Sequence, residues 1–536
     1  MLTLAPNASS RESTSACVGS YCLSVRSAFI ALVAPCVLAT SLSHPSRAHA
    51  QDAEVIAESP EVAPPVEAQS PPTLPAVEPP AVAEPAAVAT PAARDPALVF
   101  LDGFHFGSYG RIIAATDLRG STGRQARLVT FAPRADEDDT YAEVELRRED
   151  HMFGVDTRMV ITLAYAGPLF QYDGDFSERI AVRNLFAEAS NILTRGLSIW
   201  GGSRMVRGDD VYLMNFWPMD NLNMVGGGLR YALEDDLEFA VQVGMSQPNN
   251  PFQRQTELLP ARAGFTPDEV FILDRPRIVL SGRATYWPFG RNEANGLKAV
   301  LYGEQHWLSA GTRLRADGTR EGLPEDSGYV LGAQLGGYIS GDHAFVNLFF
   351  RYARGLGAYD PLGVPFGTGT VITTGRAEEI RLALSGNWEW RANPDIAFGV
   401  MLGAWWRVFH DADPALFSRA AVSEGAIAIR PQVWFGDVAG VAVDLSYQGL
   451  QQLAINELTG NPDGGSVYKL ALMPFVSPLG RGSYTRPQIR LVYSVTGRDL
   501  GARNLLNPGD PRVSQDFEHF LGVNVEWWFS STSYAP

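Results

Sequence analysis

Residues 199–228 carry a mixture of aromatic rings and fixed charges that could bind a sugar. The side chains concerned are Trp200, Tyr212, Phe216, Trp217, Arg204, Arg207, Asp209 and Asp210. Aromatic rings can cover the apolar face of a sugar ring, and charged groups can hydrogen-bond its hydroxyls. The core of a soluble domain could hold the same rings, so the surrounding elements must decide between a sugar site and a packed core.

The motifs of common enzymes and metal sites are not visible. The eight histidines are scattered and form neither an HExxH motif nor a pair at helical spacing. There is no Walker loop and no GxSxG nucleophile elbow. Glu143 and Glu145 could form the carboxylate pair of a glycosidase, but their spacing fits one face of a strand better. We therefore predict no catalysis, no cofactor and no metal.

Composition excludes some classes of partner. The net charge of −16 makes a nucleic-acid partner unfavourable. No apolar run approaches the roughly 18 residues of a membrane-spanning helix, but β-strands cross membranes with short alternating segments that lack such a run. The cysteines stand only at positions 17, 22 and 36. We expect that segment to be removed, which leaves the body without a disulfide.

The first 97 residues divide into two segments. Arg26, the apolar run 28–42 and Ala48-His49-Ala50 predict a signal peptide over residues 1–50. The alternative is a lipoprotein signal ending at Cys36, which Pro35 disfavours. Residues 51–97 consist mainly of Pro, Ala, Val and Glu without an aromatic residue. They predict a disordered periplasmic linker, which could contact peptidoglycan.

The sequence pattern of residues 98–529 is typical of an all-β domain. Segments of about ten alternating residues are separated by Gly, Pro, Asn and Asp. Residues 441–446, for example, read Val-Ala-Val-Asp-Leu-Ser. The length suits an antiparallel transmembrane β-barrel of 16 to 18 strands, followed by a short tail at 530–536. A secreted soluble β protein is the alternative, but no repeat of fixed length supports a propeller or β-helix.

Residues two positions apart in a strand share a face, a rule that we call strand parity. Strand parity places several aromatic residues on the polar face of their strands, and in a barrel this face lines the lumen. These residues are Tyr109, Tyr141, Phe345, Tyr484 and Trp528. Each shares its face with charged or amide side chains, as Trp528 does with Asn524 and Glu526. We interpret them as a lumenal stripe for a solute with apolar and polar faces. Alternatively, some pack under an inward-folded loop.

Four segments together resemble the maltoporin-like carbohydrate porins of Gram-negative outer membranes. They are Phe-Gly-Ser-Tyr-Gly-Arg at 106–111, Thr-Tyr-Ala-Glu at 140–143, the stretch 191–228, and Tyr-Thr-Arg-Pro-Gln-Ile-Arg at 484–490 with Glu-Trp-Trp-Phe at 526–529. The resemblance implies an 18-stranded barrel that lies in outer-membrane lipid as a homotrimer. It also implies that carbohydrates pass through it by facilitated diffusion.

The resemblance also implies roles for individual residues. The family's aromatic slide falls on the five residues that parity places in the lumen. Its ionic track, which hydrogen-bonds sugar hydroxyls, corresponds to Arg111, Glu143, Arg183, Arg204 and Arg207, with Arg127 or Arg134 as a further candidate. Its constriction corresponds to Asn215, which stands at an acidic position of the family's track, and to Trp217, which stands at the family's narrowest-point tyrosine. Gly208 stands where the family has an arginine. Phe170 or Tyr172 could supply the aromatic that the family takes from a neighbouring subunit.

Three functions therefore remain open at this point. A sugar channel fits the aromatic stripe and the implied track. A general or anion-preferring diffusion porin fits the uncharged Asn215 at an acidic track position, with Arg111, Arg183 and Arg204 near the bore. A secreted sugar-binding β protein fits the aromatic stripe without requiring a membrane.

Overall fold

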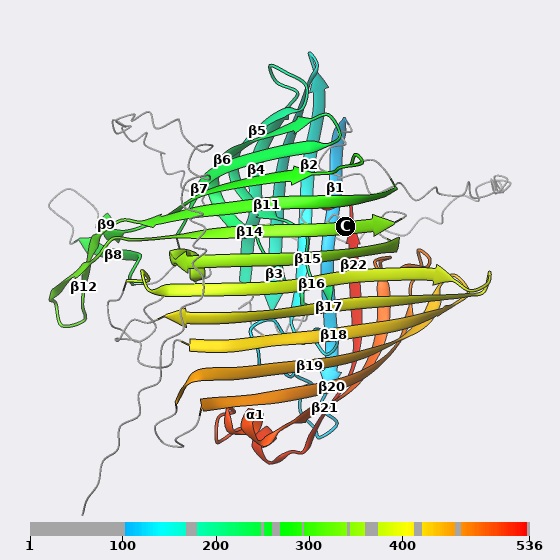
Figure 1. Ribbon diagram of the computed structural model, residues 1–536. Coiled ribbons are helices and arrows are strands. Elements are labelled where there is room, and N and C mark those ends of the chain that lie inside the picture. Colours follow the sequence, from blue (N-terminus) through cyan, green and yellow to red (C-terminus); the bar gives the residue numbers. More distant parts are fainter. Residues whose placement is uncertain are drawn as a thin grey trace, which may run out of the picture. The chain divides into compact units, whose positions relative to one another are not determined.

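The chain forms an 18-stranded antiparallel sheet that closes into a barrel (Figure 1). The computed structural model describes residues 102–167, 179–247, 251–259, 268–291, 294–339, 343–359, 373–411, 421–455 and 462–532. The first barrel strand, β1 (Gly103–Thr116), pairs with the last, β22 (Phe517–Phe529), and so closes the sheet. The predicted fold class is confirmed. The signal peptide and linker lie outside the described residues and stay predictions.

The other barrel strands follow one another around the wall. They are β2 (Thr140–Met152), β3 (Val155–Gly167), β4 (Arg179–Ser190), β5 (Leu197–Arg207), β6 (Asn221–Leu233), β7 (Leu237–Ser246), β10 (Arg277–Tyr286), β11 (Asn295–Leu308), β14 (Asp326–Ile339), β15 (Ala344–Gly355), β16 (Ala377–Arg391), β17 (Ile396–Asp411), β18 (Ala421–Phe435), β19 (Ala439–Ile455), β20 (Pro462–Val476) and β21 (Gln488–Arg498).

Smaller elements lie in the connections. Two hairpins are formed by β8 (Arg254–Leu259) with β9 (Asp268–Asp274) and by β12 (Gly311–Leu314) with β13 (Arg320–Leu323). The helical turns are η2 (Tyr212–Met214), η4 (Leu356–Ala358), α1 (Leu500–Asn504) and η6 (Pro511–Ser514). Within the described part of the chain, no helix is long and apolar enough to cross a membrane.

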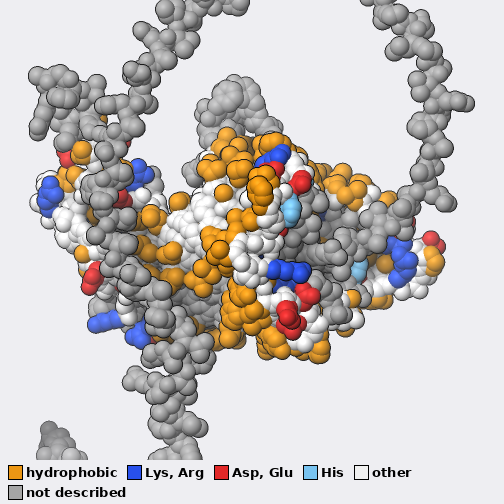
Figure 2. Space-filling model, turned by 90° about the horizontal axis from the view of Figure 1, so that it is seen from above, with side chains coloured by type: hydrophobic (Ala, Val, Ile, Leu, Met, Phe, Trp, Pro, Cys, Tyr) orange, Lys and Arg blue, Asp and Glu red, His pale blue; other side chains and the backbone are white. Residues whose placement is uncertain are grey.

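Side chains alternate between the two sides of the wall, as the sequence pattern predicts. In β21, Ile489 and Leu491 are 47% and 48% exposed, whereas Gln488 and Arg490 are 3% and 8% exposed. The exposed apolar residues face outward, where a membrane would cover them. Figure 2 shows wide hydrophobic patches on the wall that it presents. The buried polar residues face the lumen.

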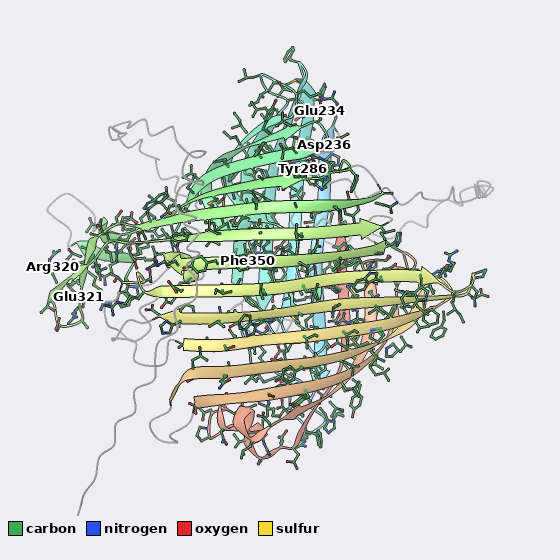
Figure 3. All side chains as sticks on the ribbon, in the orientation of Figure 1. Glu234, Asp236, Tyr286, Arg320, Glu321 and Phe350 are labelled. Atoms are coloured by element: carbon green, nitrogen blue, oxygen red, sulfur yellow. The ribbon has the colours of Figure 1, made fainter. Side chains whose placement is uncertain are left out.

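Connections differ in length between the two ends of the barrel. At one end the turns are short, as between β6 and β7, where Glu234 and Asp236 lie (Figure 3). At the other end the connections are long and include the hairpin that carries Arg320 and Glu321. Outer-membrane barrels place short turns on the periplasmic side and long loops outside. We orient this barrel accordingly.

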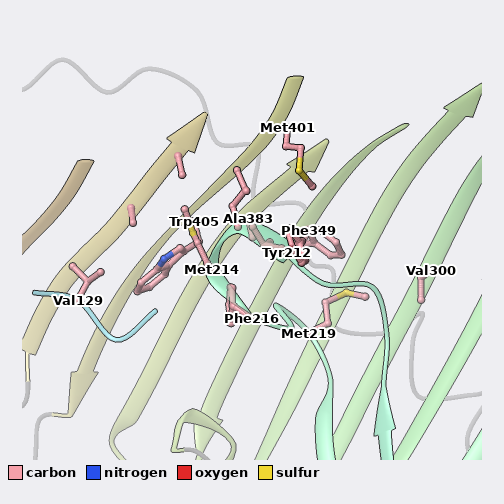
Figure 4. Close-up of a cluster of buried hydrophobic side chains, with 14 of the residues drawn as sticks. Val129, Tyr212, Met214, Phe216, Met219, Val300, Phe349, Ala383, Met401 and Trp405 are labelled. Atoms are coloured by element: carbon pink, nitrogen blue, oxygen red, sulfur yellow. The ribbon is translucent and has the colours of Figure 1, made fainter. Parts of the chain in front are cut away.

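Two long connections fold into the lumen and pack on each other. Phe131, in the connection between β1 and β2, stacks on Phe216, in the connection between β5 and β6, with ring centres 3.9 Å apart. Trp405 of β17 contacts both rings, at 5.1 Å and 5.8 Å. Together with η2 they form a buried apolar cluster against the inner wall (Figure 4). This cluster fills part of the lumen and positions the connection 208–220.

Candidate functional site

The structure brings the five predicted lumenal aromatic residues into one row. Its members in order are Tyr141, Tyr109, Trp528, Tyr212, Tyr484 and Phe345, and neighbouring ring centres are separated by 6.0, 6.4, 6.2, 5.4 and 6.0 Å. We call these six residues the aromatic row. Tyr109, Tyr141 and Trp528 meet because β1 pairs with both β2 and the last strand, β22. Phe345 stands on β15 and joins the row across the lumen through Tyr484.

Tyr212 is the member that the sequence argument missed. Tyr212 belongs to η2, in the inward connection, and its ring lies between those of Trp528 and Tyr484. Its hydroxyl donates to Glu526 Oε2 at 2.6 Å and accepts from Arg490 at 3.2 Å and from Arg486. Strand parity could not identify Tyr212, because η2 is not a strand. The density of aromatic residues in 199–228 was the available signal.

Tyr484 also differs from expectation. Parity placed it on the strand that carries Gln488 and Arg490, but β21 begins only at Gln488. Tyr484 lies in the connection after β20, where Ser477 and Ser483 are buried. Its place in the row is therefore set by an inward-folded connection rather than by a strand.

Guanidinium groups lie over several rings of the row. Arg111 and Arg183 approach the Tyr141 ring centre to 5.5 Å and 5.9 Å. Arg486 lies 4.3 Å from the Trp528 ring, and Arg134 lies 4.8 Å from the Tyr212 ring. Such cation–π contacts fix the rings and bring positive charge to the row.

Three predicted track residues lie beside the end of the row at Tyr141. Glu143 accepts a hydrogen bond from the Tyr141 hydroxyl, and its Oε1 lies 3.6 Å from Arg183 Nε. Glu143 Oε2 is buried and has no hydrogen-bond partner among the described residues. Arg111 pairs with Glu137 at 3.0 Å. Glu143 thus keeps one acceptor oxygen without a hydrogen bond, buried beside the end of the row.

The other two predicted track residues, both on β5, lie away from the ring-to-ring contacts of the row. Arg204 donates to Glu188 at 3.3 Å and lies 4.4 Å from the Phe186 ring. Arg207 donates to Asn221 at 2.7 Å and lies 3.7 Å from the Trp217 ring. The structure therefore couples Arg207 to the predicted constriction. It does not bring Arg204 to the row.

The connection 208–220 is held by ion pairs at both ends. Asp209 pairs with Lys298 at 2.5 Å, and Asp220 pairs with Arg283 at 2.8 Å. Asn215 takes a left-handed conformation, with φ 48°, directly after η2. This reversal lets Phe216 pack into the apolar cluster while Trp217 lies under Arg207.

Adjacent carboxyl groups in this connection have opposite pKa shifts. Burial opposes ionisation of Asp209, but Lys298 and Arg283 outweigh it and lower its pKa to about 2. Burial and the neighbouring charge of Asp209 raise the pKa of Asp210 to about 7. Asp210 is thus the carboxyl group in this connection that changes charge near neutral pH.

The model of the LamB porin family matches residues 104–529. The chain belongs to the LamB porin family. It is therefore an outer-membrane β-barrel channel rather than an enzyme, as the sequence predicted, and LamB porins pass carbohydrates. This membership does not support the alternative of a secreted soluble β protein. Among curated proteins, none matches the chain significantly.

Solved structures similar to this LamB porin are distant. The outer-membrane channel DcaP of Acinetobacter baumannii is 8% identical, with 81% of this chain and 100% of that chain covered and a TM-score of 0.35. OccK10 of Pseudomonas aeruginosa is 10% identical, with 79% and 98% covered and a TM-score of 0.38. OccK2 of the same organism is 12% identical, with 80% and 98% covered and a TM-score of 0.37.

Some predicted residues take no part in the row. Arg127 pairs with the exposed Asp139, whereas Arg134 is buried beside the row, so of these two candidates only Arg134 lies near the rings. Phe170 and Tyr172 lie outside the described residues. The described part of the chain holds no group of three His, Cys, Asp or Glu side chains that could bind a metal ion.

Proposed function

We propose that this LamB porin conducts carbohydrates across the outer membrane by facilitated diffusion along the aromatic row. The observation that supports this most is the continuity of the row, in which successive ring centres are 5.4 to 6.4 Å apart. A pyranose ring is of similar size to one such step. Tyr141, Phe345, Tyr484 and Trp528 are partly exposed and can contact a solute in turn, whereas Tyr109 and Tyr212 are buried and join these rings to one another.

Many weak contacts suit diffusion better than a few strong ones. A ring contact contributes roughly 0.5–1.5 kcal/mol beyond area burial. The free-energy barrier for moving a sugar from one ring to the next is then small, because one contact replaces another. Arg183, which is paired with Glu143, stands beside the row and can replace the water that sugar hydroxyls lose.

The inward connection sets the bore in this proposal. Ion pairs to Lys298 and Arg283 and the apolar cluster hold it against the wall. We propose that Trp217 and Asn215 form the constriction, as the family resemblance implies. Trp217 is larger than the tyrosine of the family at this place, whereas Gly208 is smaller than the arginine.

Single-channel recording tests the proposal. The purified protein is placed in a planar bilayer, and maltose, sucrose and longer oligosaccharides are added at millimolar concentration. We expect brief, concentration-dependent interruptions of the ion current. If no sugar interrupts the current, and liposome swelling is equally fast for all solutes of one size, the sugar-channel proposal is wrong.

A general or anion-preferring porin is the second candidate. Asn215 leaves the acidic position of the implied track without charge, and Glu526 is surrounded by three arginines. Both features favour anions. This candidate predicts chloride selectivity without block by any sugar, so the same recordings separate it from the first.

Two further parts of the proposal rest on the sequence. We propose a homotrimer, which cross-linking of the detergent-extracted protein tests by the presence or absence of a trimer band. We also propose that residues 51–97 are a linker that the barrel does not need. Deletion of 52–91 should leave conductance unchanged, and loss of channel assembly would show a structural role instead.

A further inference from the structure

We infer that the aromatic row selects sugars that carry a negative charge, such as uronates, over neutral sugars of the same size. The inference rests on the proposed function, because it assumes that sugars travel along the row. It goes beyond it by naming the chemical class of the solute. Three observations support it.

The first observation is that arginines outnumber carboxylates beside the row. The arginines are Arg111, Arg134, Arg183, Arg486 and Arg490, and the carboxylates paired with them are Glu137, Glu143 and Glu526. The excess is local, since the whole chain has a net charge of −16. Positive charge on one wall of a narrow lumen concentrates anions there.

The second observation concerns Glu526, which is fully buried at the centre of this set. Its carboxylate accepts from Arg134, Arg486 and Arg490, each at 2.9 Å. Arg134 also pairs with Glu137, which pairs with Arg111 as well, so two carboxylates stand among four guanidinium groups. The Tyr212 hydroxyl donates a hydrogen bond to the Glu526 carboxylate at 2.6 Å. As a donor it is neutral, so it adds no second negative charge.

The third observation is that the positive groups lie at the rings themselves. Arg111 and Arg183 flank Tyr141, and Arg486 lies over Trp528. Arg183, whose side chain is 23% exposed, is the arginine that a sugar at Tyr141 can reach directly. Arg111, Arg134, Arg486 and Arg490 are buried and act on the sugar through their charge. Arginine binds carboxylate and phosphate through two parallel hydrogen bonds, whereas a neutral hydroxyl offers neither the charge nor this geometry.

Other ionisable groups near this set do not cancel the excess. Arg207 lies close enough to Glu143 to act on its charge and adds to the positive side. Asp210 faces Arg134 and Arg207, but burial and Asp209 raise its pKa to about 7, so it is only partly ionised at neutral pH. Asp136 is paired with Lys469.

The test compares two trisaccharides with the same number of rings in single-channel recordings at low salt. We expect trigalacturonate to reach half-maximal block at a concentration about tenfold lower than maltotriose, equal to about 1.4 kcal/mol. Because Coulomb attraction is screened by salt, the difference should shrink at about 1 M KCl. A KCl gradient across wild-type channels should give a reversal potential of the sign for anion selectivity.

Two single-residue variants test whether the preference for trigalacturonate arises at the aromatic row. Arg183→Gln removes a partly exposed charge beside Tyr141 and should reduce the preference for trigalacturonate severalfold while block by maltotriose changes less. Arg320→Gln removes the same charge from the exposed hairpin β12–β13, away from the barrel wall (Figure 3), and should leave both unchanged. Heat-modifiable migration on gels checks that each variant is folded.

The outcomes separate the two proposals. If maltotriose blocks as well as trigalacturonate at low salt, the charge inference is wrong and the sugar-channel proposal stands. If neither trisaccharide blocks, the sugar-channel proposal fails and the inference fails with it. If Arg320→Gln reduces the preference as much as Arg183→Gln does, the selectivity does not arise at the row.

Discussion

The guanidinium group of Arg486 lies 4.3 Å from the centre of the Trp528 ring. The same side chain donates to Glu526 at 2.9 Å and to the Tyr212 hydroxyl, so it joins two rings of the aromatic row to the buried carboxylate between them. The row is therefore held by a polar network as well as by ring contacts. Its geometry should respond to changes in either.

Trp528 is the ring through which the two halves of the row meet. Trp528→Ala removes the contacts to Tyr109 and Tyr212, so the row is interrupted at its centre. We expect the concentration for half-maximal sugar block to rise about tenfold, consistent with one lost ring contact. Ion conductance should stay similar or increase. Single-channel recording measures both, and unchanged sugar block would remove Trp528 from the path.

Tyr212 should contribute its ring and its hydroxyl separately. Tyr212→Leu removes the ring between Trp528 and Tyr484 and should weaken sugar block severalfold. Tyr212→Phe keeps the ring but removes the donor to Glu526, so it should preserve block and lower thermal stability by about 1–2 kcal/mol. Equal block in both variants would show that the ring is not part of the path. Thermal unfolding monitored by circular dichroism measures the stability term.

Trp217 should limit the bore if the proposed constriction is correct. Trp217→Ala removes a large side chain that lies 3.7 Å from the Arg207 guanidinium. We expect higher single-channel conductance, because more of the lumen is open to water. Trp217→Phe is the matched control and should change conductance less. A conductance equal to wild type in both variants would place the constriction elsewhere.

Gly208 leaves room for the Asp220–Arg283 ion pair. An added Cβ would lie 2.5 Å from Asp220 Oδ1 and 2.6 Å from Arg283 Nη1, so these groups would have to move. Gly208→Ala should therefore loosen the connection, increase current fluctuations and destabilise the protein by about 1–3 kcal/mol. Gly322→Ala adds a Cβ in open space on β13 and should change neither property. If Gly208→Ala changes neither the current fluctuations nor the stability, the ion pair does not hold the connection.

Asp210 should make stability depend on pH. Its pKa is raised to about 7 in the folded protein, whereas an unfolded aspartate ionises near pH 4. Stability is therefore lost as pH rises from about 4 to about 7, because the unfolded state releases its proton first. Asp210→Asn abolishes this loss and should be more stable than wild type at pH 8, by about 1–2 kcal/mol after allowance for partial exposure.

The Asp210 measurement compares thermal unfolding of wild type and Asp210→Asn at pH 4 and pH 8. At pH 4 the difference between the two proteins should be small, since the carboxyl group is protonated in the folded state and about half protonated in the unfolded state. A difference that is the same at both pH values would indicate an effect of shape rather than charge. Asp395→Asn, in the exposed turn between β16 and β17, is the control.

Much of the fold could be predicted from the sequence because alternation is a local property. In a strand, each side chain points to the face opposite its neighbour, so the polar and apolar faces of residues 488–493 can be assigned without a structure. The same parity placed Tyr109, Tyr141, Phe345 and Trp528 in the lumen. The barrel followed from the number and length of such segments.

Parity fails where the chain leaves the strands. Tyr212 and Tyr484 stand in inward-folded connections, and nothing in their immediate sequence fixes the direction of their rings. Their positions depend on contacts between distant segments, such as that of Tyr212 with Glu526, 314 residues away. Sequence pattern alone could not supply these pairings.

The sequence pattern by itself determined a barrel of 16 to 18 strands, its lipid-facing and lumenal faces, and most of the aromatic row, and the family resemblance implied 18 strands. Only the tertiary structure decided that the row is continuous and that three arginines converge on Glu526. The physical reason is that the two kinds of interaction join residues at different separations along the sequence. Alternation is set by neighbouring residues along the chain, whereas ring contacts and ion pairs across a lumen depend on how the closed sheet brings its ends together.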